Sequence, residues 1–276
     1  MSGRLEGKVA FVTGAARGQG RSHAIRLAEE GADIIAIDIC DQVASVPYVM
    51  GTSADLEQTA KEVQAVGRRI VTAKADVRNY DQIASAVEQG VSELGRLDIV
   101  CANAGIASLG RSHELTEEQW LDLIDINLNG VWRTAKAAIP HLKASGGGSI
   151  VMTSSTQGVS ANQNISHYVA AKHGVIGLMR SLALELAQDW IRVNAVLPTQ
   201  VDTGMIQYDD VYKFFRPDLA HPGKADFAEA SMASNALPIP WVDPVDISNA
   251  IVFLCSDEGR YITGIALPID AGNLLK

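Results

Sequence analysis

The segment Thr13-Gly14-Ala15-Ala16-Arg17-Gly18-Gln19-Gly20 lies between an apolar run, residues 9–12, and a helical pattern over about residues 18–30. A buried strand that runs through closely spaced glycines into a helix is typical of a dinucleotide-binding turn. Glycines allow the tight turn and let the backbone approach a pyrophosphate, whose charge meets the helix N-terminus. The sequence therefore predicts dinucleotide contacts from Gly14, Arg17, Gly18, Gln19 and Gly20.

The second apolar run, residues 33–37, is followed by Asp38. A carboxylate at this position accepts hydrogen bonds from the adenosine ribose hydroxyls and repels a 2′-phosphate. Arg17 in the glycine turn argues the other way, because a cation there favours a phosphorylated ribose. Asp38 and the neighbouring Ile39 are expected nearer the ribose edge, so the sequence favours NAD over NADP.

Short β-branched runs alternate with helical patterns along the whole chain. The expected strands are residues 9–12, 33–37, 70–73, 99–101, 149–152, 193–196 and 265–269. The expected helices cover about residues 18–30, 54–66, 81–94, 116–142, 166–188 and 244–255. This alternation predicts an α/β protein with a doubly wound parallel sheet covered on both faces, a Rossmann fold. No repeat or linker divides the chain, so residues 1–276 are expected to form a single domain.

Two segments are longer than a simple crossover requires. Residues 39–53 precede the second expected helix, and residues 202–240 contain several aromatic side chains. Long irregular segments in compact domains are usually functional covers or disordered loops, and the aromatic content argues against disorder. We expect an insertion at 39–53 and a substrate lid at 202–240.

Polar or glycine-bearing motifs follow one expected strand after another. They are Asp76-Val77, Asn103-Ala104-Gly105, Ser154-Ser155 and Pro198. In an open parallel sheet, ligands bind outside the carboxyl ends of the strands. Any one of these motifs could simply form a turn after a strand, but together they predict one ligand-binding edge of the sheet.

Tyr168 and Lys172 lie four residues apart on an expected helix and so share one face. Alone, such a pair is equally consistent with a tyrosine and a lysine on a solvent-exposed helix face and with a catalytic pair. Ser155, at the end of an expected strand, supplies the chemical context. Oxidation of an alcohol needs a base, and a nearby ammonium favours the phenolate of a tyrosine. Ser155 would hold the substrate oxygen as charge develops.

Asn127 lies in the middle of an expected helix, where asparagine is unfavourable. It is either a solvent-facing helix residue or a residue that holds a water linking Lys172 to solvent.

Composition excludes several classes of protein. The net charge of −9 argues against nucleic-acid and anionic-membrane partners, which require clustered lysine and arginine. No apolar stretch is long enough to span a membrane, and the N-terminus resembles no signal peptide, so we expect a cytoplasmic protein. The six histidines lack ligand spacing, so no metal site is expected. Cys101 and Cys255 lie in apolar runs and are expected to be buried thiols.

These residues together resemble the short-chain dehydrogenase/reductase family. The shared motifs are Thr13-Gly14-x-x-x-Gly18-x-Gly20, Asn103-Ala104-Gly105, Asn127, Ser155, Tyr168-x-x-x-Lys172, Thr263-Gly264 and Asp270-Ala271-Gly272. The resemblance implies a catalytic tetrad of Asn127, Ser155, Tyr168 and Lys172, a seven-stranded sheet and a homotetramer. It also implies nicotinamide contacts from Val201 and Thr203, and cofactor contacts from Tyr168 and Lys172.

Two positions depart from the family pattern. Thr199 follows Pro198 where glycine is usual, and Gln19 stands where an aliphatic residue is usual. With the insertion after Asp38, they resemble the carveol dehydrogenase-like, mycofactocin-associated subfamily. That resemblance implies NAD held under the insertion between turnovers and reoxidised there by a peptide-derived, mycofactocin-type redox carrier. Val46, Pro47 and Tyr48 would then close over the adenine side.

The sequence thus predicts an NAD-dependent alcohol dehydrogenase acting on a small hydrophobic alcohol or ketone. Tyr208, Tyr212, Phe214, Phe215 and Trp241 either line an apolar pocket for a terpene-like cyclic secondary alcohol or pack the lid onto the body. Two alternatives are an NADPH-dependent carbonyl reductase and a non-catalytic nicotinamide sensor. The presence of all four catalytic residue types argues against the sensor.

Overall fold

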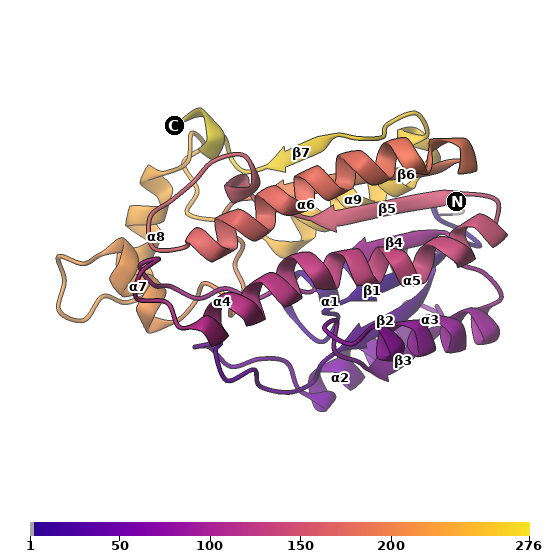
Figure 1. The fold of residues 1–276 in the computed structure, drawn as a ribbon, viewed down its shortest axis with the longest axis horizontal. Helices are drawn as coiled ribbons and strands as arrows, with labels where there is room; N and C mark the ends of the chain where they lie inside the picture. Colours follow the sequence, from indigo (N-terminus) through magenta and orange to yellow (C-terminus); the bar gives the residue numbers. More distant parts are fainter. Residues whose placement is uncertain (1–2) are drawn as a thin grey trace.

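A seven-stranded parallel sheet forms the centre of the molecule. In the computed structural model, which describes residues 3–276, the strand order is β3-β2-β1-β4-β5-β6-β7 (Figure 1). The strands are β1 (Val9–Thr13), β2 (Asp33–Asp38), β3 (Ile70–Lys74), β4 (Ile99–Ala102), β5 (Gly148–Thr153), β6 (Ile191–Pro198) and β7 (Ala266–Ile269). Every pair of neighbouring strands is parallel. The predicted α/β class and all seven strands are confirmed.

Helices cover both faces of the sheet. One face carries α1 (Gly18–Glu29), α2 (Ser53–Ala65) and α9 (Pro244–Cys255), and the other carries α3 (Tyr80–Leu94), α5 (Gly130–Ala144) and α6 (Ser166–Glu185). Alternate residues of β1 supply the two cores: Phe11 packs with α3, α5 and α6, whereas Ala10 and Val12 pack with the other set. Burial on both faces explains why the strands are apolar throughout.

The first and the ninth α-helices pack side by side although more than 200 residues separate them. The Ser22 and Ser248 hydroxyls lie 2.7 Å apart, and His23 Nδ1 lies 2.8 Å from the Ser248 hydroxyl. Farther along, Arg26 Nε donates to Asn249 Oδ1 at 2.8 Å. Helix α9 therefore closes the sheet face on which the glycine turn begins α1.

The expected helix at residues 116–142 is interrupted. It consists of α4 (Glu117–Ile124), a π-helical segment (Asp125–Asn129) and α5. A π-bulge widens the turn and is frequent at functional sites. The side chain of Asn127, within this segment, bonds to a loop rather than facing solvent, so the solvent-facing reading of this residue is wrong.

The two long segments differ in regularity. Residues 39–52 contain no helix or strand, whereas the segment at 202–240 contains α7 (Asp209–Phe215) and α8 (Lys224–Ala233). Both extend from the carboxyl edge of the sheet. At this edge the strand order reverses between β1 and β4, which is where open α/β sheets bind ligands.

Candidate active site

The glycine turn has the close backbone contacts that its sequence predicts. Gly14 and Gly18 adopt φ values of +69° and +55°, which favour glycine. A Cβ on Gly14 would lie 2.9 Å from the Ala104 Cα, and a Cβ on Gly20 would overlap the Gly14 carbonyl. The turn is thus packed against the residues that follow β4, and it leaves the N-terminus of α1 open to the cleft.

Asp38, at the end of β2, is hydrogen-bonded to the same turn. Its carboxylate accepts hydrogen bonds from the Ala16 and Cys40 backbone N–H groups, each at 3.0 Å. Cys40 adopts a φ of 49°, so the chain turns sharply as it leaves β2. Each oxygen of an ionised carboxylate has a further lone pair, so Asp38 can still accept from ribose hydroxyls.

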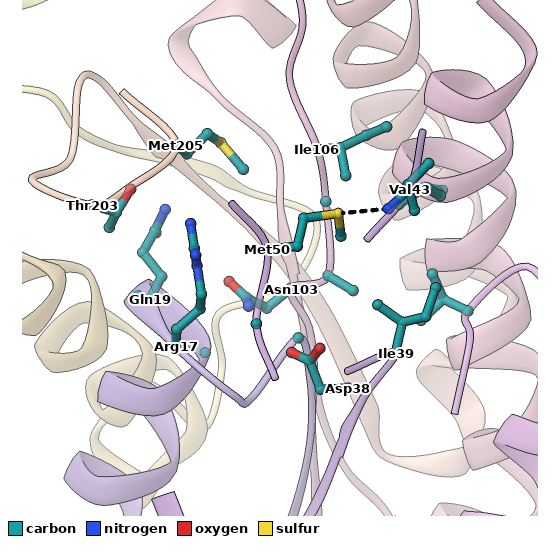
Figure 2. Close-up of a pocket in the computed structure, with 18 of the residues that line it drawn as sticks. Arg17, Gln19, Asp38, Ile39, Val43, Met50, Asn103, Ile106, Thr203 and Met205 are labelled. Carbon is teal, nitrogen blue, oxygen red and sulfur yellow. Dashed lines mark hydrogen bonds between the residues drawn. The ribbon is translucent and has the colours of Figure 1, made fainter. Parts of the chain in front are cut away.

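Arg17 extends away from Asp38, toward the opposite wall of the cleft (Figure 2). Its guanidinium carbon lies 5.9 Å from the centre of the Tyr48 ring. A Cβ on Gly204 would come within 2.5 Å of Nη2, so the guanidinium rests on that glycine. Arg17, the cation that would favour NADP, is therefore directed away from Asp38, the carboxylate that disfavours NADP.

Two adjoining cavities run along the carboxyl edge of the sheet. The larger, about 900 Å³ and open to solvent, extends from Asp38 to Met205. It is lined by the predicted residues Gly14, Arg17, Gly18, Gln19, Gly20, Asp38, Ile39, Asp76, Val77, Asn103, Ala104, Gly105 and Thr203. The smaller, about 540 Å³, is lined by Ser155, Tyr168, Lys172 and Val201, and shares Gln19, Asn103, Gly105 and Thr203 with the larger. All the predicted cofactor residues therefore line one continuous cleft.

The catalytic candidates come from two neighbouring elements. Ser155 follows β5, and Tyr168 and Lys172 lie on α6. Lys172 Nζ donates to the Thr153 carbonyl at 2.8 Å and lies 5.4 Å from the centre of the Tyr168 ring. The Ser155 hydroxyl accepts from the Gln157 backbone N–H at 3.1 Å. These contacts hold all three side chains in fixed positions at one end of the cleft.

Burial controls ionisation at this site. It lowers the pKa of Lys172 to about 8 and raises the pKa of Tyr168 above its ordinary value. A hydrogen bond with Ser155 opposes the rise at Tyr168. In the protein alone the pKa of Tyr168 is therefore shifted upward, since the cost of burying the phenolate dominates.

Asn127 lines neither cavity but is fully buried behind them. Its Nδ2 donates to the Ile106 carbonyl, and its Oδ1 accepts from the Ile106 N–H, both at 2.8 Å. A Cβ on Gly105 would lie 3.3 Å from Asn127 Oδ1 and 3.7 Å from Lys172 Nζ. Asn127 therefore fixes the loop after β4 between the π-helical segment and the lysine.

Residues 39–52, which we call the cover, form an ordered loop. The Gln42 side-chain amide donates to the Val46 and Tyr48 carbonyls and accepts from the Met50 N–H. Ser45 donates to Asp122 on α4 at 2.7 Å. The loop is thus tied both to itself and to the body of the protein.

Of the three cover residues expected to close over the cleft, only Tyr48 lines it. Val43, Tyr48, Met50 and Gly51 line the larger cavity, whereas Pro47 is exposed and Val46 packs into the core. The Tyr48 hydroxyl accepts from the Ala107 N–H at 3.1 Å, beyond the end of β4. Tyr48 therefore reaches past the adenosine side toward the catalytic end.

Most lid aromatics pack with one another. Phe227 is fully buried, with ring centres of Tyr212, Phe215 and Trp241 at 5.5, 4.8 and 5.5 Å. Tyr208 instead packs on Tyr48 of the cover, with ring centres 5.4 Å apart. Of the two readings of these aromatics, packing is the one that the structure supports.

Several cleft residues carried no motif that the sequence reasoning used. They are Val43, Met50, Gly51, Ala75, Ile106, Thr153, Met205 and Ile206. The available signal was position: Ile106 follows Gly105, and Met205 and Ile206 follow Thr203. In the sequence, an apolar residue beside a motif cannot be told from a core residue, and only the fold shows that it lines the cleft.

Within residues 3–276, no three His, Cys, Asp or Glu side chains gather as a metal ion would require. Cys101 and Cys255 are buried free thiols, as predicted, and burial raises the pKa of Cys255 to about 11. Over the same range, no helix combines the length and apolar character needed to cross a membrane.

Comparison with known proteins agrees with this geometry. Residues 8–210 match the family model described as short chain dehydrogenase. The chain is 57% identical to (-)-trans-carveol dehydrogenase of Rhodococcus erythropolis, with 99% of each chain covered. The structure of carveol dehydrogenase from Mycobacterium avium in complex with NAD superposes with a TM-score of 0.98 at 58% identity, covering 99% of this chain and 100% of that one. A short chain dehydrogenase from Mycobacterium paratuberculosis bound to NAD gives 0.90 at 41% identity, covering 99% and 100%.

Proposed function

The chain belongs to the short-chain dehydrogenase family, and from this premise we propose that it is an NAD-dependent dehydrogenase of cyclic secondary alcohols. The observation that carries the proposal is the continuous cleft. It joins Asp38 and the glycine turn at one end to Ser155, Tyr168 and Lys172 at the other. A binding module would need only the first end, whereas an alcohol dehydrogenase needs both.

Tyr168 is the base that takes the proton of the substrate hydroxyl. Ser155, whose hydroxyl already interacts with that phenol, donates a hydrogen bond to the substrate oxygen. Lys172 carries positive charge below about pH 8 and stabilises the phenolate across the 5.4 Å to the ring centre. Asn127 keeps the loop after β4 in place and holds a water that links Lys172 to solvent.

NAD fits the larger cavity on chemical grounds. The crowded Gly14–Gly20 contact leaves the α1 N-terminus facing the cleft for a pyrophosphate, and Asp38 offers acceptors to a ribose. When bound, oxidised NAD accepts the hydride and brings a positive charge that favours the Tyr168 phenolate. The position of Arg17, away from Asp38, favours NAD over NADP.

The substrate would be a small hydrophobic alcohol. Pro198, Val201, Met205 and Ile206 give the catalytic cavity apolar walls, and Ser155 and Tyr168 are placed to hold one hydroxyl. The carveol dehydrogenase relative, at 57% identity, supports a cyclic terpene-like alcohol.

We further propose that the cover retains NAD between turnovers, and that a mycofactocin-type redox carrier reoxidises it in place. The internal hydrogen bonds of Gln42 and the Ser45–Asp122 bond support a cover that stays closed. The Tyr48–Tyr208 contact supports a cover joined to the lid over one cleft.

We also propose a homotetramer that works in the cytoplasm. Support comes from large apolar side chains left partly in solvent on α4 and α5, since such surfaces commonly mark interfaces. Trp120 is 40% exposed, Leu121 60% and Trp132 43%.

Absorbance at the NADH band tests the function. Carveol is added to the purified protein with and without free NAD, and Tyr168→Phe serves as the matched variant that keeps the ring. Steady turnover with free NAD supports the dehydrogenase alone. A single-turnover rise without added NAD, continuing only with an artificial electron acceptor, supports retained cofactor as well. If neither condition gives a signal, carveol-type alcohols are not substrates.

A further inference from the structure

We propose that the side-chain amide of Gln19 recognises the carboxamide of the nicotinamide ring. The inference rests on the NAD-dependent function proposed above. Gln19 is the second residue of α1 and lines both cavities. In Figure 2 its side chain extends from the helix toward Thr203 and Met205, away from Asp38. It therefore lies where the cofactor half of the cleft meets the catalytic half.

The decisive observation is an unpaired acceptor. Gln19 Oε1 is buried and has no hydrogen-bond partner among the described residues. Three other described side chains, His23, Gln157 and His167, also carry a buried unpaired polar atom, but none of them lines either cavity. Buried acceptors in native proteins are nearly always paired, because an unpaired one costs free energy. A molecule bound in the cleft can supply the donor that Gln19 Oε1 lacks.

The chemistry of NAD limits what this donor can be. The pyrophosphate oxygens are ionised and only accept, so they cannot pair with Oε1. The remaining donors are the adenine amino group, the ribose hydroxyls and the carboxamide NH₂. Asp38 marks the adenosine end, whereas Gln19 lines the cavity that contains Ser155 and Tyr168. The nicotinamide half must lie there, because its ring has to reach the alcohol carbon.

Two carboxamides are complementary to each other. Each has an oxygen that accepts and an NH₂ group that donates, so Gln19 can accept from the ring carboxamide through Oε1 and donate to it through Nε2. An aliphatic side chain could fill a similar volume but could form neither bond. Thr203 stands beside this position, since a Cβ on Gly18 would lie 3.3 Å from its Cγ2.

The proposal predicts selectivity for the NH₂ group of the cofactor. A site built to hydrogen-bond a substrate group rejects an analogue that lacks this group. The suitable analogue is 3-acetylpyridine adenine dinucleotide, in which a methyl group replaces the NH₂. Wild-type protein should prefer NAD over this analogue, and Gln19→Leu should lose that preference by roughly five- to tenfold, the usual effect of one neutral hydrogen bond.

The experiment measures bound nucleotide rather than activity. Wild-type, Gln19→Leu and Gln19→Glu proteins are unfolded in urea and refolded in an equimolar mixture of NAD and the analogue. After desalting, chromatography of the denatured protein gives the ratio of the two nucleotides bound. Refolding in the mixture removes any effect of slow cofactor exchange, and circular dichroism confirms that each variant has refolded. Gln19→Glu keeps the acceptor oxygen, so it should keep the wild-type ratio even if it binds less of both nucleotides.

The outcomes separate this inference from the proposed function. A wild-type preference for NAD that is lost in Gln19→Leu and kept in Gln19→Glu supports the carboxamide contact. An unchanged ratio in Gln19→Leu with less of both nucleotides bound overturns it and assigns the donor to a ribose hydroxyl. An unchanged ratio with unchanged amounts bound also overturns it, while the NAD-dependent function stands. Wild-type protein that binds neither nucleotide would overturn both.

Discussion

Lys172 is a buried lysine whose ionisation is shifted by its surroundings. It is 3% exposed, and burial lowers its pKa to about 8 from 10.5. The unfolded chain therefore binds more protons than the folded one between pH 8 and 10.5. The contribution of Lys172 to the free energy of unfolding consequently rises with pH across that window. The shift corresponds to about 3 kcal/mol.

We expect the free energy of unfolding of the wild-type protein to rise by about 3 kcal/mol relative to Lys172→Met between pH 8 and 10.5. Below pH 8 the difference between the two proteins should be constant. Urea titrations at several pH values measure it. Lys61→Met, at an exposed position of α2, is the control and should show no such trend. A flat difference for Lys172→Met would mean that this lysine titrates normally.

Ser155 should affect the pH dependence of catalysis as well as its rate. Its hydrogen bond opposes the rise that burial causes in the pKa of Tyr168. In Ser155→Ala, the pKa of Tyr168 should therefore be higher, and the low-pH limb of the pH profile of alcohol oxidation, where Tyr168 has to lose its proton, should move to higher pH. Ser155→Thr keeps a hydroxyl and should restore the wild-type limb. A Ser155→Ala enzyme that is slower at every pH, with the limb unmoved, would contradict this coupling.

Asp38 should determine cofactor choice. Asp38→Asn removes the charge but keeps one oxygen, which can accept from either the Ala16 or the Cys40 N–H, so one of the two bonds to the turn remains. Removing a carboxylate a few ångströms from a phosphate should lower the preference for NAD over NADP at least tenfold. Ratios of kcat/KM for the two cofactors measure it, with the exposed Asp41→Asn as control. An unchanged ratio would show that Asp38 does not determine the preference for NAD over NADP.

Among the elements, the cover should govern how fast NAD leaves. Tyr48→Phe keeps the ring that packs on Tyr208 but leaves the Ala107 N–H without its 3.1 Å acceptor. Losing one such bond should speed release of bound NADH roughly fivefold. Loss of NADH fluorescence in excess NAD measures the rate. Tyr261→Phe, at a residue 79% exposed, should release NADH at the wild-type rate. Equal rates in Tyr48→Phe and wild type would show that this bond does not limit exchange.

The elements that the sequence predicted share a regular period or a local motif. The five inner strands were visible because both of their faces are buried, the edge strands β3 and β7 as short apolar runs, and the helices because of their spacing. The π-helical segment was not, and its Asn127 bonds to Ile106 in a contact across the fold that no local pattern shows. The packing of the lid aromatics on Phe227 could not be predicted either, because an apolar residue gives the same sequence pattern whether it lines a pocket or packs in a core.

At the scale of the whole molecule, the tetramer should be measurable directly. Light scattering coupled to gel filtration should give about four times the chain mass of 29.4 kDa. Replacing Trp132, which is 43% exposed, by Glu places a charge on the apolar surface of α5 and should lower that mass. A monomer mass for the wild-type protein would contradict the proposed assembly.

The pairing of α1 with α9 has a consequence for how the chain is made. A ribosome delivers the glycine turn and α1 early, but the partners Ser248 and Asn249 are among the last residues to emerge. Until then, the apolar side of α1 remains in water beside a half-built sheet. The nascent protein therefore stays exposed to chaperones and proteases almost to the end of synthesis, and a chain cut short before residue 244 would lack the helix that seals its first cofactor-binding element.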